Sequence, residues 1–391
     1  MEKTKRWIKN NLIFFISLII LFLSVVFSAI ILTEYKIQSD LESTRVGHIY
    51  LGSDKSNYEN RLNNEISQFL SEADYEIKYQ NETYNLDFAF FEFSEQATIN
   101  NITKNTNNIA YFNLTDSNNF EINLRNVFGN SVINSINFDE LVSDILSQLG
   151  KLDYYNVFSL TNYFTETSIN TIILEETYPI SNQNIVNDLS LISDITIKPL
   201  EQFSLLNEVS EYNISNESLS FLASMIQDLT LETHFNNYIF QSYNILPSWA
   251  NETMNIKILK TNNFDFSFYN SFDQEYKFII EIIDSTTIKL KLEGMPYVYT
   301  YTIEETTTSI PYDTIYIDDP DLEDITYKVN ETDTEITYQK LLESGSNGSL
   351  HTFVRTITYN DDSTESIILY YIKFASTPEI IAENIVTKAG D

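Results

Sequence analysis

Few side chains in this chain of 391 residues could take part in bond-making chemistry. The chain has no cysteine, so thiolate nucleophiles, thiolate metal sites and thiol redox chemistry are excluded. Its three histidines, His48, His234 and His351, lie far apart in the sequence. None has a second metal-binding side chain at helical spacing, and we therefore expect no metal and no cofactor.

A hydroxyl nucleophile is the chemistry that stays open. Ser220 lies in a predicted helix over residues 218–233, and His234 is the nearest histidine that could act as its base. Nothing in their spacing brings the two side chains together. We favour a structural interpretation, in which Ser220 caps the helix and His234 is exposed, and we expect no catalytic residue.

A run of carboxylates is a candidate for metal binding. Its members are Asp318, Asp319, Asp321, Glu323 and Asp324. Hard cations such as calcium take several carboxylate oxygens, so the run could bind calcium. It lacks the glycine-bearing spacing of a known calcium loop, and we favour a solvated acidic loop.

Helices and strands must both be present to position these residues. Apolar residues recur at helical spacing over 53–71, 138–149, 185–192 and 218–233. Alternating or β-branched runs predict strands at 46–52, 75–79, 83–88, 195–197, 254–260 and 265–269, at several places up to residue 304, and through most of 310–391. We expect an α+β fold that ends in a small all-β domain.

The uncharged, apolar run over residues 12–32 predicts a single transmembrane helix. At about 1.5 Å per residue it spans roughly 30 Å, the thickness of the hydrocarbon core of a bilayer. Lys3, Lys5, Arg6 and Lys9 precede the run, which favours a cytoplasmic N-terminus and extracellular C-terminal domains. A cleaved signal peptide is the alternative, although its apolar region would be only about 7–15 residues long.

The net charge of −33 narrows the classes of partner. Nucleic acid is excluded because a phosphate backbone needs a basic surface. Electrostatic docking on anionic lipid is excluded for the same reason. Solubility or adaptation to a salty exterior explains the charge, and capture of a basic partner stays open.

Three segments resemble the VanW family of bacterial envelope proteins. The family turn Pro-Gly-Glu-x-Phe-Ser corresponds to Pro199–Ser204, with Leu200 at the glycine. The family segments Pro-x-Gly-x-Asp-Ala-Thr-Val and Asp-x-x-Phe-x-Asn correspond to Pro247–Met254 and Asp265–Asn270.

The flanking segments extend this resemblance. Residues 46–90 look like the peptidoglycan-binding domain that precedes VanW domains. The C-terminal part is similar to the small all-β G-five domain, through its paired glycines Gly345 and Gly348, a central Arg355 and the hairpin turn at Asn360. The resemblance implies a membrane-anchored protein of the cell envelope with a degenerate VanW domain.

This sequence departs from the family where the family is most reactive. The family's Cys-Gln pair corresponds to Ser220 and Phe221, and a later family histidine near 239–241 is missing. Any reaction that needs the thiol cannot run here.

The predicted division of the chain has six parts. They are a cytoplasmic tail at 1–11, a transmembrane helix at 12–32, a stalk at 33–45, an α+β domain at 46–175, a mixed α/β VanW-like domain at 176–305 and a G-five-like all-β domain at 306–391.

The candidate ligand-binding residues lie in the VanW-like segments. They are Glu201, Phe203, Ser204, Ser220, Trp249, Asn251, Asp265 and Asn270. For two of them we favour a structural role, in which Glu201 faces water and Trp249 is a core aromatic.

The predicted function is non-catalytic binding or scaffolding at the cell envelope. The expected partners are the lipid bilayer, through residues 12–32, and a cell-wall glycan or surface proteins. The alternatives are a wall-modifying enzyme with unrecognised residues and a surface adhesin of a wall-poor bacterium.

Overall fold

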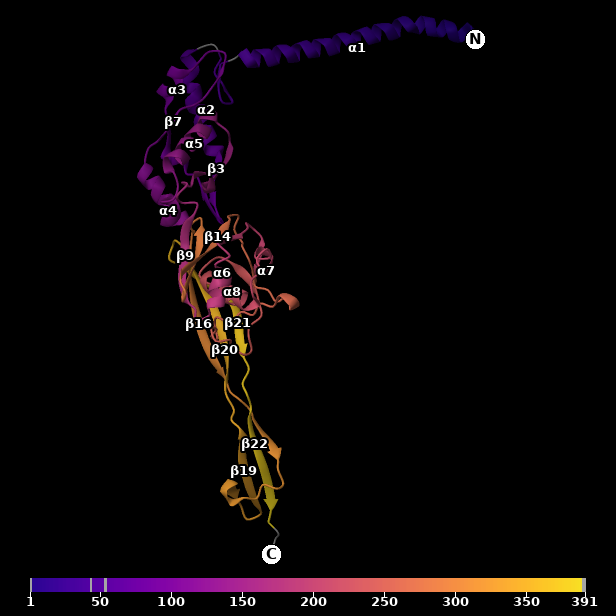
Figure 1. Cartoon of the computed structure of the whole chain (residues 1–391). Coiled ribbons are helices and arrows are strands. Elements are labelled where there is room, and N and C mark those ends of the chain that lie inside the picture. Colours follow the sequence, from indigo (N-terminus) through magenta and orange to yellow (C-terminus); the bar gives the residue numbers. More distant parts are fainter. Residues whose placement is uncertain (1, 43, 53–54, 389–391) are drawn as a thin grey trace. The chain divides into compact units, whose positions relative to one another are not determined.

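The structure, a computed structural model, describes residues 2–42, 44–52 and 55–388. About a third of the chain is helical and slightly more is strand, at 32% and 37%. The predicted mixture is confirmed, with one apolar helix near the N-terminus and an all-β C-terminal region. The chain divides into two compact units, one made of residues 1–124 and 137–163 and the other of 125–136 and 164–391 (Figure 1).

Helix α1 (Glu2–Glu42) contains the predicted transmembrane segment. Within it Ile16–Tyr35 has a mean hydropathy of 2.8 and no buried residue, and it is long and apolar enough to cross a membrane. The helix continues through most of the segment predicted as a stalk, because no proline or glycine interrupts it before residue 42.

The first unit combines amphipathic helices with small sheets. Its strands form three sheets, ordered β4–β3–β8, β2–β1–β6 and β5–β7. The helix predicted over 138–149 is α5 (Phe138–Lys151), and the hairpin predicted over 75–88 is β3 and β4. The other elements are β1 (Arg45–Val46), β2 (Ile49–Tyr50), α2 (Tyr58–Glu72), β3 (Asp74–Tyr79), β4 (Glu82–Asn85), β5 (Phe91–Phe93), α3 (Glu95–Asn101), β6 (Asn107–Asn108), β7 (Phe112–Leu114) and β8 (Tyr155–Ser159).

The single strand predicted over 46–52 is wrong. The segment folds into the tight hairpin β1–β2, because Gly47 turns the chain with φ +55° and a side chain there would meet the carbonyl of Lys151 at 2.5 Å. Helix α4 (Ser117–Ile133) has a non-helical residue, Gly129, and its residues belong to both units.

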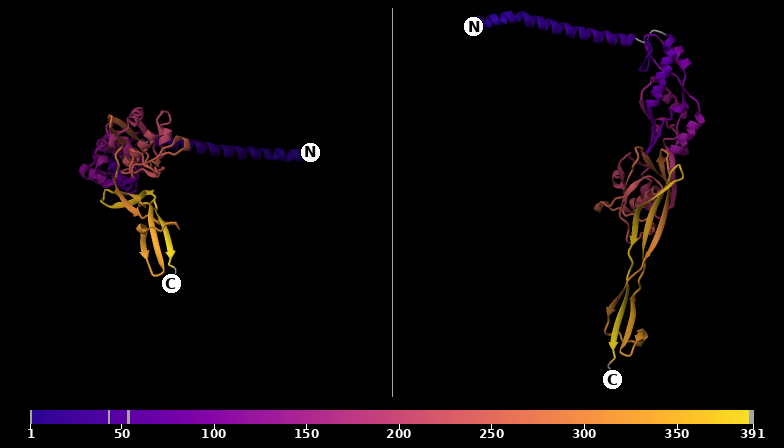
Figure 2. Two further views of the ribbon diagram at one scale, coloured as in Figure 1. Left: turned by 60° about the horizontal axis from the view of Figure 1, so that its bottom comes forward. Right: turned by 180° about the vertical axis from the view of Figure 1, so that it is seen from behind.

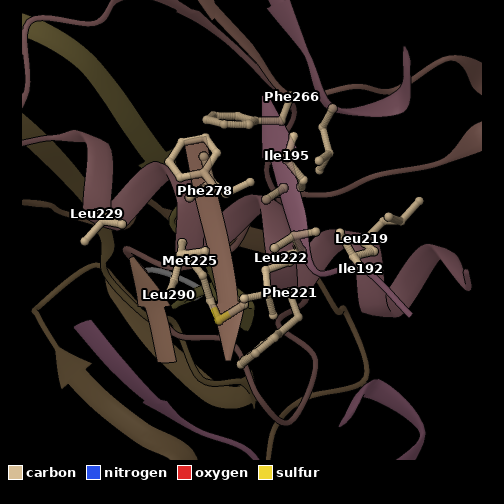
Figure 3. Close-up of a cluster of buried hydrophobic side chains, with 14 of the residues drawn as sticks. Ile192, Ile195, Leu219, Phe221, Leu222, Met225, Leu229, Phe266, Phe278 and Leu290 are labelled. Atoms are coloured by element: carbon tan, nitrogen blue, oxygen red, sulfur yellow. The ribbon is translucent and has the colours of Figure 1, made fainter. Parts of the chain in front are cut away.

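The second unit has its core around one buried helix. Helix α8 (Asn216–Thr230) and helix α6 (Gln183–Leu189) share a hydrophobic cluster with the antiparallel sheet β10–β14–β15–β9. Figure 3 shows Leu222 and Met225 of α8 near Phe278 and Leu290 of that sheet. Its strands and the small neighbouring elements are β9 (Thr171–Pro179), β10 (Asp194–Ile197), β11 (Gln202–Ser204), α7 (Leu205–Glu208), β12 (Asn236–Ile239), β13 (Ser267–Tyr269), β14 (Tyr276–Asp284) and β15 (Thr287–Gly294).

Two predicted domain boundaries fall inside strands of this unit. The boundary at 175/176 lies within β9, whose residues pair with β15 from Thr171 to Pro179. The boundary at 305/306 lies within β16 (Thr300–Ile310). Sheet pairing crosses both places, which local sequence composition does not reveal.

Three passes of the chain build the C-terminal region. Each pass contributes one strand to the sheet β16–β20–β21 and one to the sheet β17–β22–β19–β18, and β18 joins the second sheet as the antiparallel neighbour of β19 (Figure 1). In both views of Figure 2 neither α6 nor α8, the described helices of this unit's core, covers the second of these sheets. The strands are β17 (Thr314–Asp318), β18 (Lys328–Glu331), β19 (Glu335–Glu343), β20 (Gly348–Thr358), β21 (Thr364–Phe374) and β22 (Glu379–Thr387).

The paired glycines lie between the end of β19 and the start of β20, where the chain passes from one sheet to the other. A side chain at Gly345 would meet the ring of Tyr312 at 2.4 Å, and one at Gly348 would meet the carbonyl oxygen of Phe374 at 2.3 Å. Each glycine is therefore required by close packing at the junction between the two sheets.

Candidate functional site

Two of the family-like segments are neighbouring strands. Phe203 of β11 pairs with Phe268 of β13, and their rings stack with centroids 4.6 Å apart. The hydroxyl of Ser204 donates to Oδ2 of Asp265 at 2.5 Å, and Oδ1 of Asp265 accepts from the backbone N–H of Leu206 at 3.0 Å. Ser204 also caps α7. These three candidate residues hold the sheet and the helix start together.

The turn before β11 keeps a glycine-like backbone without a glycine. Leu200 has φ +51°, in the left-handed region that favours glycine, and its side chain is exposed. Its N–H donates to the carbonyl of Phe272 at 2.9 Å, and the carbonyl of Glu201 accepts from the N–H of Asn270 at 3.1 Å. The Glu201 side chain faces water, as predicted.

Asn270 is buried and orients His234. Its Nδ2 donates to the carbonyls of Lys198 at 3.0 Å and Gln274 at 2.9 Å, so its Oδ1 accepts from Nε2 of His234 at 2.7 Å. The imidazole stacks on Phe272 with centroids 3.8 Å apart. The prediction of an exposed His234 is wrong, because it is only 6% exposed.

Burial lowers the pKa of His234 to about 3, and the positive charge of Arg355 acts in the same direction. The ring is therefore neutral near pH 7, with its proton on Nε2. Its Nδ1 is buried and bonds no described residue. Desolvation of the charged form explains this state.

Ser220 is a structural residue of α8, and the prediction that it caps the helix is wrong. Ser215 is the N-cap. The Ser220 hydroxyl donates to the carbonyl of Asn216 at 2.7 Å and accepts from the N–H of Ile258 at 2.9 Å. Its other partner is the hydroxyl of Tyr243, so the structure does not bring it together with His234.

Three side chains of α8 accept hydrogen bonds from backbone N–H groups of residues 256–260, and Ser220 is the middle one of the three. Ser224 accepts from the N–H of Ile256 at 2.9 Å, and Oδ1 of Asn216 accepts from the N–H of Lys260 at 3.2 Å. Four helical residues rise about 6 Å and two extended residues about 6.6 Å, so the two spacings match. The strand predicted over 254–260 is therefore wrong, since this extended segment bonds to helix side chains and otherwise makes only isolated bridges, of Ile256 with Ser242 and of Leu259 with Phe264.

Trp249 and Asn251 also have structural partners. The Trp249 ring packs edge-on against Phe221, with centroids 5.4 Å apart, and belongs to the periphery of the core, as favoured from the sequence. Oδ1 of Asn251 accepts from the N–H groups of Thr253 at 2.8 Å and Met254 at 2.7 Å, which closes a local turn.

In the acidic loop, the side chain of Asp324 closes a local turn. Asp324 accepts from the N–H and the hydroxyl of Thr326, both at 2.9 Å, and these bonds lower the pKa of Asp324. Among the described residues, no group of three or more His, Asp and Glu side chains could hold a metal ion.

Two adjoining cavities of the second unit are the features that the sequence did not indicate. The larger, of about 430 Å³, is lined by β9, by the start of β16 and by Tyr297, Tyr299 and Tyr301. The smaller, of about 200 Å³, is lined by Asp228 of α8 and by carboxylates of β9. Leu174 and Glu232 line both. The alternation of tyrosine at 297, 299 and 301 is the signal that could have predicted the larger cavity.

Arg355 of β20 contacts the residues that follow α8 and the ring of Tyr301, beside the larger cavity. It is 1% exposed, and its guanidinium donates to the carbonyls of Leu231 at 2.8 Å and Phe235 at 2.7 Å, just beyond α8. It also lies over the ring of Tyr301, 5.9 Å from the centroid. The negative end of the α8 dipole favours a cation here.

No family model and no curated protein matches the chain. Among solved structures, the "IgA1 Protease G5 domain structure" is 20% identical over 22% of this chain and 86% of that chain, with a TM-score of 0.16. A likeness of this size says nothing about what the chain binds.

Proposed function

We propose that the chain is a membrane-anchored, non-catalytic binding protein of VanW-like architecture. Helix α1 would hold it in the membrane, and the second unit would carry the ligand site. The length and hydropathy of Ile16–Tyr35 support the anchor. The basic residues before it favour display of both units outside the cell.

The VanW-like part of the proposal is supported by the β11–β13 pair. The two family-like segments are hydrogen-bonded neighbours in register, with Phe203 opposite Phe268. Leu200 retains the positive φ that the family's glycine would favour. These observations concern how the segments fold, and they fit a chain that keeps the family's framework after losing its cysteine.

One observation carries the choice of binding over catalysis. The hydroxyl of Ser220 is buried and bonded on both sides, to Asn216 and to Ile258. His234 is neutral, buried and bonded to Asn270. A nucleophile needs a base within hydrogen-bond reach and access to a substrate. The open, aromatic cavities are better suited to holding a ligand.

The test uses the full chain in nanodiscs of zwitterionic lipid and purified bacterial cell wall. We expect the protein to sediment with the wall and to leave the mass spectrum of wall fragments unchanged. If the protein stays in the supernatant, wall binding is refuted. Any product of cleavage or transfer would refute the proposal that the protein is non-catalytic. Empty nanodiscs are the control for lipid adsorption.

A further inference from the structure

The larger cavity has an aromatic wall and an unpartnered hydroxyl. Tyr297 and Tyr301 meet edge to face, with centroids 5.5 Å apart, and Tyr299 lines the same space. Tyr301 is 8% exposed, and its hydroxyl makes no hydrogen bond to any described residue. Since Tyr301 lines the cavity, its hydroxyl is available to a ligand there.

Burial also raises the pKa of Tyr301, although the charge of Arg355 opposes that shift. The group is therefore a neutral phenol near pH 7 and can donate as well as accept a hydrogen bond.

The smaller cavity adds negative charge at one side of this space. Its walls include Glu175, Glu176, Asp228 and Glu232, and no Lys, Arg or His is among the described residues that line either cavity. Lys289 pairs with Glu175 at 3.5 Å, and the hydroxyl of Tyr178 donates to Asp228 at 2.9 Å. The exposed side chains of Glu176 and Glu232 have no such partner in the described chain.

We propose that the two cavities form one site for a primary ammonium group on an aliphatic stem, that is, a lysine side chain of a peptide. The stem would lie against Ile173 and Leu174, the ammonium group near Glu232, and a peptide polar group would bond the Tyr301 hydroxyl. Tyrosine faces attract ammonium groups, and a volume of about 430 Å³ suits one or two residues.

The negative charge of the whole chain supports this choice. With a net charge of −33 the surface potential raises the local concentration of cations and speeds their encounter with the site. A neutral sugar could stack on the same tyrosines and donate hydroxyl hydrogen bonds to the carboxylates, but it would lack the charge–charge attraction that an ammonium group gains from them. This inference deepens the binding function proposed above by naming its site and ligand chemistry.

The experiment measures the affinity of a blocked lysine, Nα-acetyl-lysine methylamide, for the full chain in zwitterionic nanodiscs by ligand-observed NMR. Its Nε-acetylated form is the matched probe, and N-acetylglucosamine is the neutral-sugar probe. We expect the blocked lysine to bind, and both neutral probes to bind at least about tenfold more weakly. No binding of the blocked lysine, or equal binding of any neutral probe, overturns the proposal.

Three variants locate the site. Glu232→Gln removes one charge and Tyr301→Phe removes one hydroxyl while keeping the ring beneath Arg355; each should weaken the blocked lysine about three- to tenfold. Glu304→Gln, an exposed carboxylate of the same strand β16 that lines neither cavity, should leave the affinity unchanged. Far-UV circular dichroism checks that each variant folds. Unchanged affinity in both site variants refutes this site.

The two proposals fail separately. Wall sedimentation without binding of the blocked lysine would leave the envelope function standing and remove this ligand. Binding of the blocked lysine without sedimentation would support this ligand and refute wall binding.

Discussion

Replacing Arg355 tests how β20 is fixed to α8. In Arg355→Met the carbonyls of Leu231 and Phe235 lose a charged donor, while the carbonyl of Thr230 keeps Tyr238 and Thr233 as donors. A hydrogen bond to a charged group contributes about 1.5–3 kcal/mol, so two lost bonds cost roughly 3–6 kcal/mol. Methionine needs no desolvation of a charge, which offsets part of that loss. We expect a net destabilisation of about 3–4 kcal/mol.

The stability of Arg355→Lys should fall between that of the parent chain and that of Arg355→Met. An ammonium group keeps the charge near the end of α8 but reaches one carbonyl in place of two, so we expect a cost of about 1.5–3 kcal/mol. The assay is guanidinium unfolding of the full chain in nanodiscs, followed by tryptophan fluorescence, to which Trp7 and Trp249 both contribute, and by circular dichroism. The matched control is Lys373→Met on β21, an exposed cation, which should change the free energy of unfolding by less than about 0.5 kcal/mol. A value for Arg355→Met within about 1 kcal/mol of the parent chain would refute the reasoning.

Three further predictions concern the same unit. Because the pKa of His234 falls to about 3 on folding, only the unfolded state takes up its proton between pH 6.5 and 3. Lowering the pH from 7 to 5 should therefore destabilise the parent chain about 2 kcal/mol more than it destabilises His234→Gln. Unfolding of both chains at both pH values measures this, and an equal loss of stability in the two chains would contradict it. Leu200→Gly should raise the free energy of unfolding by about 0.5–1 kcal/mol because it relieves a positive φ at an exposed side chain, and a loss of stability would show that Leu200 packs. Gly348→Ala places a methyl group 2.3 Å from the carbonyl oxygen of Phe374 and should cost at least about 2 kcal/mol, and a neutral result would mean that the strands can separate there.

Local patterns predicted most helices and hairpins of this chain. The apolar spacing over 138–149 and 185–192 reflects burial on one face, and α5 and α6 lie there. The anchor needed only length and hydropathy. The strand predicted over 254–260 failed because three of its amides bond to side chains of a helix some 40 residues earlier, at Asn216, Ser220 and Ser224, and its β-bridges are isolated.

The candidate site was harder to predict for a related reason. Motif likeness pointed to Ser204, Asp265 and Asn270, and the structure gives all of them hydrogen bonds within the fold. The cavity instead arises where β9, the end of α8 and the start of β16 meet. Its residues are far apart in the sequence, so their proximity depends on tertiary pairing. The buried state of His234 follows from the same kind of contact.

The attachment of residues 256–260 to α8 has a consequence for how this unit assembles and opens. The amide groups of Ile256, Ile258 and Lys260 donate to acceptors that are four residues apart on a helix, and we expect these bonds to slow the exchange of their protons. These acceptors are aligned only after the first turns of α8 have formed. The segment therefore cannot acquire these three hydrogen bonds before the helix does, and fraying of the helix start breaks them, which leaves the segment held by its backbone bonds to residues 241–243. Helix and segment are thus coupled in local unfolding, although they lie far apart in the sequence.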